Sequence, residues 1–356
     1  MPATSTPERS RKPGSPIRPA RKTARARKVA KPATAKPVAR KRLTVASITA
    51  GAPWHKSRPV TLTPNATVDD AIGVIAAACR DHWDANLAAA VAGHHPEGVH
   101  QFRVGLRRFR TALTLFKDYI PASQRAWLKT EAKELGDLLG PARDLDVFLG
   151  ELALPVAHAA VSDPQVAVMM RSAREARGAA HARLADALTD RRYRRFMTRL
   201  STWIEGQGWR TGQNAHDGEA GARGFARTTL NRRLAKIQKR AKAIMESAPE
   251  ELHELRIDIK KARYGFEFFA KLLPQRRVER VGRLLKALQD ELGHLNDIDV
   301  AGRTINALAA RARDIDTRSA VSRVGATLSA NFKPLAKTAL PEAARIAERL
   351  REQKPL

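Results

Sequence analysis

Residues 100–121 read HQFRVGLRRFRTALTLFKDYIP, and residues 253–274 read HELRIDIKKARYGFEFFAKLLP. Both stretches repeat apolar and basic side chains every three or four positions, which is the period of an α-helix. They start 153 positions apart, and further pairs follow without a gap at that offset: Leu139-Gly140 with Leu292-Gly293, and DLDV at 144–147 with DIDV at 297–300. Two related halves are therefore predicted.

Outward from these stretches, the helical period continues from about residue 65 to the C-terminus, and strand-like alternation is nearly absent. The pattern predicts an all-α fold. Residues 206–224 contain glycines at 208, 212, 218 and 221 and predict a linker. We expect two helical bundles, residues 65–210 and 220–350, packed about a pseudo-twofold axis. Helices are predicted over 69–92, 97–119, 122–139, 144–160, 164–188, 191–205, 224–247, 250–272, 276–293 and 297–313, with two more to the C-terminus.

Charge points to a polyanionic partner. The 356 residues include 65 Lys and Arg against 36 Asp and Glu, a net charge of +29. Fourteen Lys and Arg lie in residues 1–42, where Glu8 is the single acid and prolines are frequent. Residues 1–64 are therefore predicted to be a disordered basic tail, with DNA as one possible partner. Cys79 is the single cysteine, which excludes a disulfide framework and favours a cytoplasmic location. No apolar run long enough to span a membrane is present.

The two repeated stretches share a basic stripe. On a helical wheel His100, Arg103, Arg107 and Arg110 fall within about 80° of one another, beside an apolar stripe that faces the core. His253, Arg256, Lys260 and Arg263 take the same angles in the second half, and Arg108 and Lys261 correspond on the other flank. Like charges stacked on adjacent turns repel, so a bound anion is the favoured explanation. The alternative is pairing with internal acids, such as Asp144, Asp146, Asp297 and Asp299.

Further basic side chains give a second candidate surface, although a solvated helix face explains each of them equally well. These are Arg227, Arg232, Arg233, Lys236, Arg195 and Arg199.

Signals for catalysis and for metal binding are weak. The phosphate-binding loop G-x-x-x-x-G-K-[ST], the zinc motif H-E-x-x-H and the nucleophile motif G-x-S-x-G are all missing. In each D-x-D motif the preceding Leu-Gly is expected to stop one helix, and the first Asp to cap the next. The second Asp is expected near the positive start of that helix, and capping and pairing with a neighbouring Arg account for both Asp residues without a metal. We therefore expect no catalytic residues, no metal and no cofactor.

These residues resemble the CHAD domain family, named for a conserved histidine in an α-helical domain. The pattern H-x-x-R-V-x-x-R-R-x-R begins at His100, L-G-x-x-R-D-x-D-V begins at Leu139, and related forms begin at His253 and Leu292. The resemblance covers about residues 65–350. It implies a basic groove or channel between two bundles that binds inorganic polyphosphate, and an association with polyphosphate or polyhydroxyalkanoate granules. Carried over by position, the binding residues are His100, Arg103, Arg107, Arg108, Arg110, His253, Arg256, Lys260, Lys261 and Arg263.

Three functions follow from the sequence, in order of preference. The first is non-enzymatic polyphosphate binding, and no E-x-E-x-K strand suggests the triphosphatase domain that some family members carry. The second is nucleic-acid binding, which the scarcity of aromatic residues disfavours. The third is a phosphohydrolase built from His100, His253 and the Asp pairs, which would need a carboxylate or a metal directed at a water.

Overall fold

The fold is entirely helical in the residues that the structure, a computed structural model, describes: 51–153, 163–211 and 217–356. Those residues contain no β-strand, as predicted. The first half comprises α1 (Val68–Ala85), α2 (Leu87–Ala92), α3 (Pro96–Leu115), α4 (Ala122–Val147), a π-helical turn η2 (Phe148–Ala153), α6 (Pro164–Thr189) and α7 (Arg191–Glu205). The second half comprises α8 (Ala222–Arg240), α9 (Pro249–Phe269), α10 (Gln275–Arg311) and α11 (Ile315–Arg351). Short 3₁₀ turns are η3 (Gly208–Arg210), η4 (Asp217–Glu219), η5 (Ala241–Ala243) and η6 (Ala270–Leu272).

Corresponding helices of the two halves start at the same offset. Pro96 opens α3 and Pro249 opens α9, both at the first turn, where proline's missing N–H costs nothing. Likewise α4 opens at Ala122 and α10 at Gln275, again 153 positions apart. The pseudo-twofold axis itself stays a prediction.

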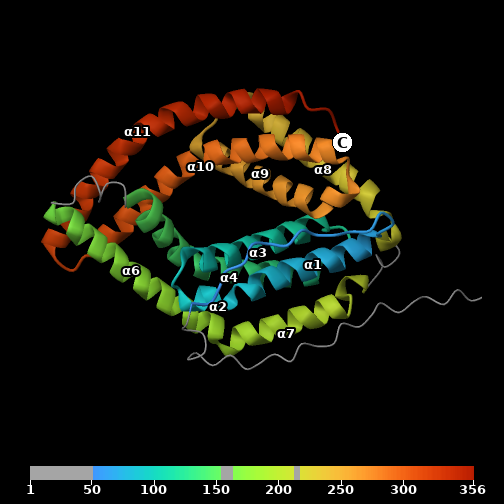
Figure 1. Cartoon of the computed structure of the whole chain (residues 1–356), viewed down its shortest axis with the longest axis horizontal. Coiled ribbons are helices and arrows are strands. Elements are labelled where there is room, and N and C mark those ends of the chain that lie inside the picture. The colour runs from blue at the N-terminus through green and yellow to red at the C-terminus, as the bar shows by residue number, and fades with distance from the viewer. Residues whose placement is uncertain (1–50, 154–162, 212–216) are drawn as a thin grey trace, which may run out of the picture. The chain divides into compact units, whose positions relative to one another are not determined.

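Helices α3 and α4 lie beside α9 and α10, and α7 packs on α1 and α6 (Figure 1). One hydrophobic core joins the halves. At its centre, the Phe116 ring stacks on Phe225 with 5.2 Å between centroids and meets the edge of Phe269 at 6.1 Å. A second core joins α6 to the far parts of α10 and α11, around Met169 and Val321. The halves are thus bound together by shared apolar burial, which is the dominant stabilising term in folding.

Four predicted helix boundaries are wrong. The helix predicted over 69–92 breaks at Asn86, whose side-chain amide donates to the carbonyl oxygens of His55 and His82. The Leu-Gly pairs do not stop helices, since α4 runs through Gly140 and α10 through Gly293. Two C-terminal helices were expected, but α11 is one helix. Glycine weakens a helix by only about 1 kcal/mol relative to alanine, and the preceding Leu139 and Leu292 are both buried in the main core.

The basic tail was predicted to reach residue 64, and that limit is too late. Val60 and Leu62 are buried in the main core. The His55 backbone N–H also donates to the Asn86 side chain at 2.8 Å. Residues 1–50 lie outside the described residues, so the disordered tail stays a prediction there.

The other predicted connections are partly outside the described ranges. The predicted linker 206–224 carries the buried Trp209 in η3, and α8 already begins at Ala222; residues 212–216 are not described. The helix expected over 144–160 is the end of α4 followed by η2, and residues 154–160 are not described. None of the helices in the described ranges combines the length and the apolar character that a membrane crossing requires.

Candidate anion-binding site

An open cavity of about 820 Å³, here called the central cavity, lies where α3 and α4 face α9 and α10. Both halves line it. Its basic and histidine side chains are Lys56, His100, Arg103, Arg107, Arg143, His253, Arg256, Lys260, Arg263, His294 and Arg303. Its acids are Asp144, Glu151, Glu267, Asp290 and Asp297.

Three of the five acids form ion pairs with neighbouring Arg or Lys side chains. Glu151 pairs with Arg143 at 3.4 Å, and Glu267 pairs with Arg263 at 3.7 Å. Asp290 is held by Lys286 at 2.5 Å. Asp144 and Asp297 are left to face the middle of the stripe, where the cations outnumber them.

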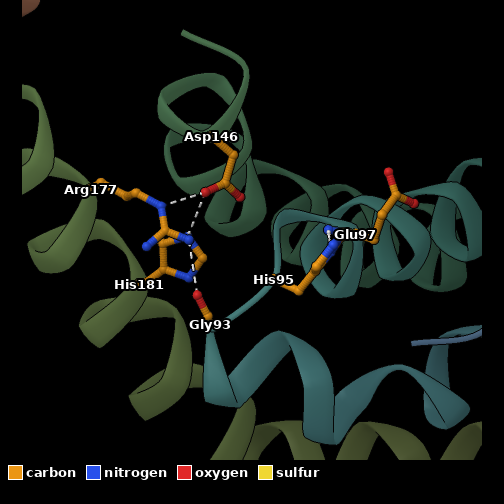
Figure 2. Close-up of polar contacts among 6 residues, drawn as sticks. All are labelled: Gly93, His95, Glu97, Asp146, Arg177 and His181. Atoms are coloured by element: carbon orange, nitrogen blue, oxygen red, sulfur yellow. Dashed lines mark hydrogen bonds and ion pairs between the residues drawn. The ribbon is translucent and has the colours of Figure 1, made fainter. Parts of the chain in front are cut away.

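Local sequence explains how the α3 stripe reaches this cavity. His95 caps α3 by accepting from the Glu97 backbone N–H at 3.1 Å (Figure 2). Phe102, Leu106 and Phe109 are buried, as the apolar stripe predicts. With that face fixed in the core, His100, Arg103 and Arg107 of the basic stripe are half-buried and line the central cavity, whereas Arg110 is exposed.

Burial and like charges act together on the pKa values of this stripe. Burial first, and then the charge of Arg143, lower the pKa of His100 to about 4. Burial and then Arg107 lower the pKa of Arg103 to about 10. The pKa of Lys260 falls to about 7, again through burial and then through Arg256. The protonated, charged forms of these three side chains are therefore less favourable here than in water.

Several of these side chains also lack a partner. Arg103 Nη1, Arg256 Nε and His100 Nδ1 are buried without a hydrogen bond. Within the described ranges, no ion pair joins Arg103, Arg107, Arg256 or Lys260 to a carboxylate. Burial also raises the pKa of Asp144 against the opposing effect of Arg103. Pairing with internal acids, the alternative explanation of the stripe, therefore does not describe these four cations.

Asp146, the second Asp of the first D-x-D motif, does not line the central cavity. The Asp146 carboxylate is fully buried and accepts from Arg177 Nε at 2.7 Å and contacts His181 Nε2 at 3.1 Å (Figure 2). Arg177 also donates to the carbonyl oxygen of Gly93 at 2.9 Å. Gly93 ends α2 with a φ of +66°, and a Cβ there would lie 2.8 Å from His181 Nδ1. Asp146 thus joins α4, α6 and the end of α2.

The capping role predicted for these motifs is wrong, because Asp144 and Asp297 lie inside continuous helices. Pairing with an Arg is confirmed for the second Asp of each motif. Asp299, the counterpart of Asp146, is exposed and pairs with Arg303.

Arg108 was predicted as a binding residue and lies away from the central cavity. It is buried, with its guanidinium carbon 5.3 Å from the centroid of the Phe268 ring. Phe268 supplies a cation–π contact that helps to hold this charge in the core. The wheel placed Arg108 on a flank, but α9 covers that flank.

The remaining predicted residues fall into three groups. Arg110 and Lys261 line a second cavity, of about 780 Å³, beside the central cavity. Arg232, Arg233 and Lys236 line a third, of about 1090 Å³, beside α8. Arg227 is exposed on α8, while Arg195 and Arg199 are exposed on α7, where Arg199 lies 3.9 Å from the Trp127 ring centroid. These last three do not line the three cavities.

Sequence reasoning missed three cations of the central cavity: Lys56, Arg143 and Arg303. Arg143 carried a signal, because it belongs to the L-G-x-x-R-D pattern, and Asn296 is its counterpart in the second half. Lys56 was assigned to the tail. In the described part of the chain, no three His, Cys, Asp or Glu side chains are grouped in a way that would hold a metal ion.

A protein-family model described as the CHAD domain matches residues 74–306, more than half of the chain. The chain belongs to the CHAD family. The crystal structure of the CHAD domain from the plant Ricinus communis is similar, with a TM-score of 0.73 and 27% identity over 86% of this chain and 99% of that chain.

Two further proteins are similar to this chain, one in fold and one over a short stretch of sequence. PptA from Streptomyces chartreusis has a TM-score of 0.55 and 14% identity over 80% of this chain and 100% of that chain, which shows the fold alone. The uncharacterized protein Rv2226 of Mycobacterium tuberculosis is 38% identical over 66 residues, 18% of this chain and 12% of that protein.

Proposed function

We propose that this CHAD protein binds inorganic polyphosphate in the central cavity and does not hydrolyse it. The observation that carries the proposal is the set of buried cations without a carboxylate partner, above all Arg103 and Arg256. Each leaves a charged nitrogen desolvated, which costs free energy that an incoming oxyanion recovers. Membership of the CHAD family, which is linked to polyphosphate, supports the same ligand.

A linear phosphate polymer suits this cavity better than a nucleic acid does. Polyphosphate carries charge at every unit and presents no base to accommodate. Of the Phe, Tyr and Trp side chains that the structure describes, Tyr264 alone lines the central cavity. Phe102 and Phe109 are in the core, so Tyr264 is the one described aromatic ring that could stack on a base in this cavity. Arg supplies planar, permanently charged donors that pair with phosphate oxygens.

Hydrolysis is not proposed, because the central cavity offers little to activate a water. A phosphohydrolase needs a metal or a directed carboxylate, and the carboxylates nearest the stripe, Asp144 and Asp297, face cations. We expect no phosphate release when the purified protein is incubated with polyphosphate and Mg²⁺. Release at enzymatic rates would overturn this part of the proposal.

The binding test uses the full chain and a matched control. Arg103→Ala/Arg256→Ala should weaken binding of long-chain polyphosphate by several kcal/mol, since each charge-assisted contact contributes about 1.5–3 kcal/mol. Arg191→Gln/Arg194→Gln removes the same charge from the exposed face of α7 and should bind like the wild type. Equal binding by all three proteins, with helicity unchanged by circular dichroism, would contradict the proposal.

Location in the cell follows from the ligand. We propose a cytoplasmic protein that associates with polyphosphate granules, with polyhydroxyalkanoate granules as the other candidate. A fluorescent fusion should co-localise with stained polyphosphate and lose that pattern in the Arg103→Ala/Arg256→Ala variant. A uniform distribution of the wild-type fusion in cells rich in granules would refute the association.

A further inference from the structure

Lys260 lies on α9, one helical turn beyond Arg256, and lines two cavities. Its side chain is half-buried and borders both the central cavity and the second cavity, of about 780 Å³. Ile259 and Ala262 beside it are fully buried and fix this part of α9 in the core. The amine of Lys260 is therefore within reach of a small solute, while the backbone that carries it is held in place.

Charged groups from three helices surround this amine. They are Arg103 and Arg107 of α3, Arg256 of α9 and Asp297 of α10. Asp297 is the single acid of the set, and within the described ranges no ion pair joins it to Lys260. Burial and the three positive charges both disfavour a proton on the Nζ atom.

The amine of Lys260 is consequently a nucleophile near neutral pH. Burial, followed by the charges of Arg256 and Arg107, lowers the pKa of Lys260 to about 7. A lysine attacks carbon only through its unprotonated amine, and desolvation or a neighbouring cation is how proteins activate one. A fully exposed lysine, with a pKa of about 10.4, is almost entirely protonated at neutral pH.

Two of the surrounding cations are placed to hold a phosphate group beside this amine. Arg103 Nη1 and Arg256 Nε are buried without a hydrogen-bond partner, and we call these two guanidinium groups the phosphate cradle. Guanidinium N–H groups pair with phosphate oxygens. A phosphate bound in the cradle brings the group attached to it close to Lys260. The site therefore fits a reagent in which a phosphate is joined through one oxygen to an electrophilic carbonyl carbon.

We propose that Lys260 is an acylation site and that its reagent is a small acyl phosphate, such as acetyl phosphate. The Nζ lone pair forms a bond to the acyl carbon, and the bond from that carbon to the bridging oxygen breaks. Inorganic phosphate leaves with the electron pair of that bond, and the nitrogen gives up one proton to phosphate or water. Nothing is oxidised or reduced, and the product is a neutral amide. The cradle stabilises the negative charge of the departing phosphate.

Acylation of Lys260 lowers the affinity of the central cavity for anions. An amide is uncharged and cannot take up a proton near neutral pH, so the cavity loses one cation. This consequence for polyphosphate rests on the proposed function, whereas the acylation itself rests on the cavity and its cations. A bound polyphosphate protects Lys260 in turn, because it occupies the cradle and favours the protonated amine.

The first test measures which lysines of the full chain react. The protein is incubated with acetyl phosphate at about pH 7.5, where a pKa near 7 leaves most of the amine neutral, and acetylated peptides are quantified by mass spectrometry. Lys260 should react roughly tenfold or more faster than the exposed Lys242 and Lys271, because its amine is neutral and its reagent is held beside it. Equal rates at the three lysines would overturn the proposal.

An uncharged acyl donor tests the role of the phosphate group. With N-hydroxysuccinimidyl acetate, the preference for Lys260 over Lys242 should be smaller than with acetyl phosphate, since the cradle cannot hold this ester. Excess tripolyphosphate should slow the reaction of acetyl phosphate at Lys260 and leave that at Lys242 unchanged. An equal preference with both donors would overturn the choice of an acyl phosphate as the reagent.

A pair of variants tests the consequence for binding. Lys260→Gln, which imitates the neutral amide, should bind long-chain polyphosphate roughly tenfold more weakly than the wild type. Lys242→Gln, on the exposed turn η5 outside the three cavities, is the control and should bind like the wild type. Selective acetylation of Lys260 in a protein that binds no polyphosphate would overturn the proposed function alone. Polyphosphate binding with Lys260 no more reactive than Lys242 would overturn the acylation site alone.

Discussion

Arg103 lies against Gly140 of the Leu-Gly motif, a contact between two helices that the sequence pattern did not predict. Arg103 Nη1 lies over Gly140 of α4, where an added Cβ would be 3.4 Å away. A Cβ at that distance would make an ordinary van der Waals contact with the guanidinium, so the glycine of the Leu-Gly motif lies against Arg103 inside a continuous helix and does not end it. Periodicity identified Arg103 as a site residue, but spacing along one helix cannot show what a second helix brings against it.

The buried charge of Arg103 should lower the free energy of unfolding when no ligand is bound. Arg103→Met removes an unpaired nitrogen and keeps apolar volume, so the free energy of unfolding should stay equal or rise by roughly 1 kcal/mol. Urea denaturation without polyphosphate measures it. A loss of several kcal/mol would mean that Arg103 is a structural residue.

Lys260 gives a pH-dependent prediction. Burial, followed by the charges of Arg256 and Arg107, lowers the pKa of Lys260 to about 7 in the folded protein, and Asp297 opposes this effect. In an unfolded chain the pKa of a lysine is about 10.4. Between those values the unfolded state binds more protons, so the free energy of unfolding of the ligand-free protein should rise from pH 7 to about 10. Thermal denaturation at several pH values should show a smaller rise in Lys260→Met than in the wild type.

Binding should show the opposite dependence on pH. Polyphosphate favours the charged amine, so binding takes up a proton and affinity should fall as the pH rises above about 7. Titrations in buffers of different ionisation enthalpy detect that uptake. If the wild type and Lys260→Met have the same affinity and the same proton uptake at every pH, the amine of Lys260 has no role in binding.

At the scale of helices, the Asp146 contacts illustrate how the two halves have diverged. Asp146 and Asp299 occupy equivalent positions in the repeat, yet one is buried between Arg177 and His181 and the other is exposed. The sequence showed the equivalence and could not show this difference, because α6 alone supplies the partners. The wrong helix ends at Leu139-Gly140 and Leu292-Gly293 have the same origin: a local signal was overridden by packing.

This contrast provides a matched pair of variants. Asp146→Ala leaves the half-buried Arg177 without its carboxylate and should lower the free energy of unfolding by roughly 3 kcal/mol. Asp299→Ala removes an exposed pair and should cost less than about 1 kcal/mol. Urea denaturation of both variants measures the difference. Equal costs would mean that Asp146 does not join α2, α4 and α6 as described.

For the whole molecule, the all-α class, the family and most of the stripe were predictable because each depends on periodicity and on a repeat. The burial of Arg108 and the anchoring of Val60 and Leu62 were not predictable, since they depend on which surfaces meet in the folded chain. The cavity of about 1090 Å³ beside α8 was also not predictable from the sequence, although Arg232 and Arg233, which line it, were among the secondary candidates.

Salt dependence tests whether the molecule as a whole acts as a polyanion receptor. Affinity for long-chain polyphosphate should fall linearly on a logarithmic plot against salt concentration, because bound cations release counterions. The slope should be shallower in Arg103→Ala/Arg256→Ala, which makes fewer phosphate contacts. A slope identical to that of the wild type would place the contacts outside the central cavity.

The central claim is that the paired stripes bind polyphosphate in preference to other phosphate polymers. Competition binding of the full chain at about 150 mM salt, where distant charges are largely screened, measures this directly, with duplex DNA and single-stranded RNA competing against long-chain polyphosphate. We predict that polyphosphate is displaced only by a large excess of either nucleic acid, and that this preference is lost in Arg103→Ala/Arg256→Ala. Equal or better competition by nucleic acid, with the variant indistinguishable from the wild type, would contradict it.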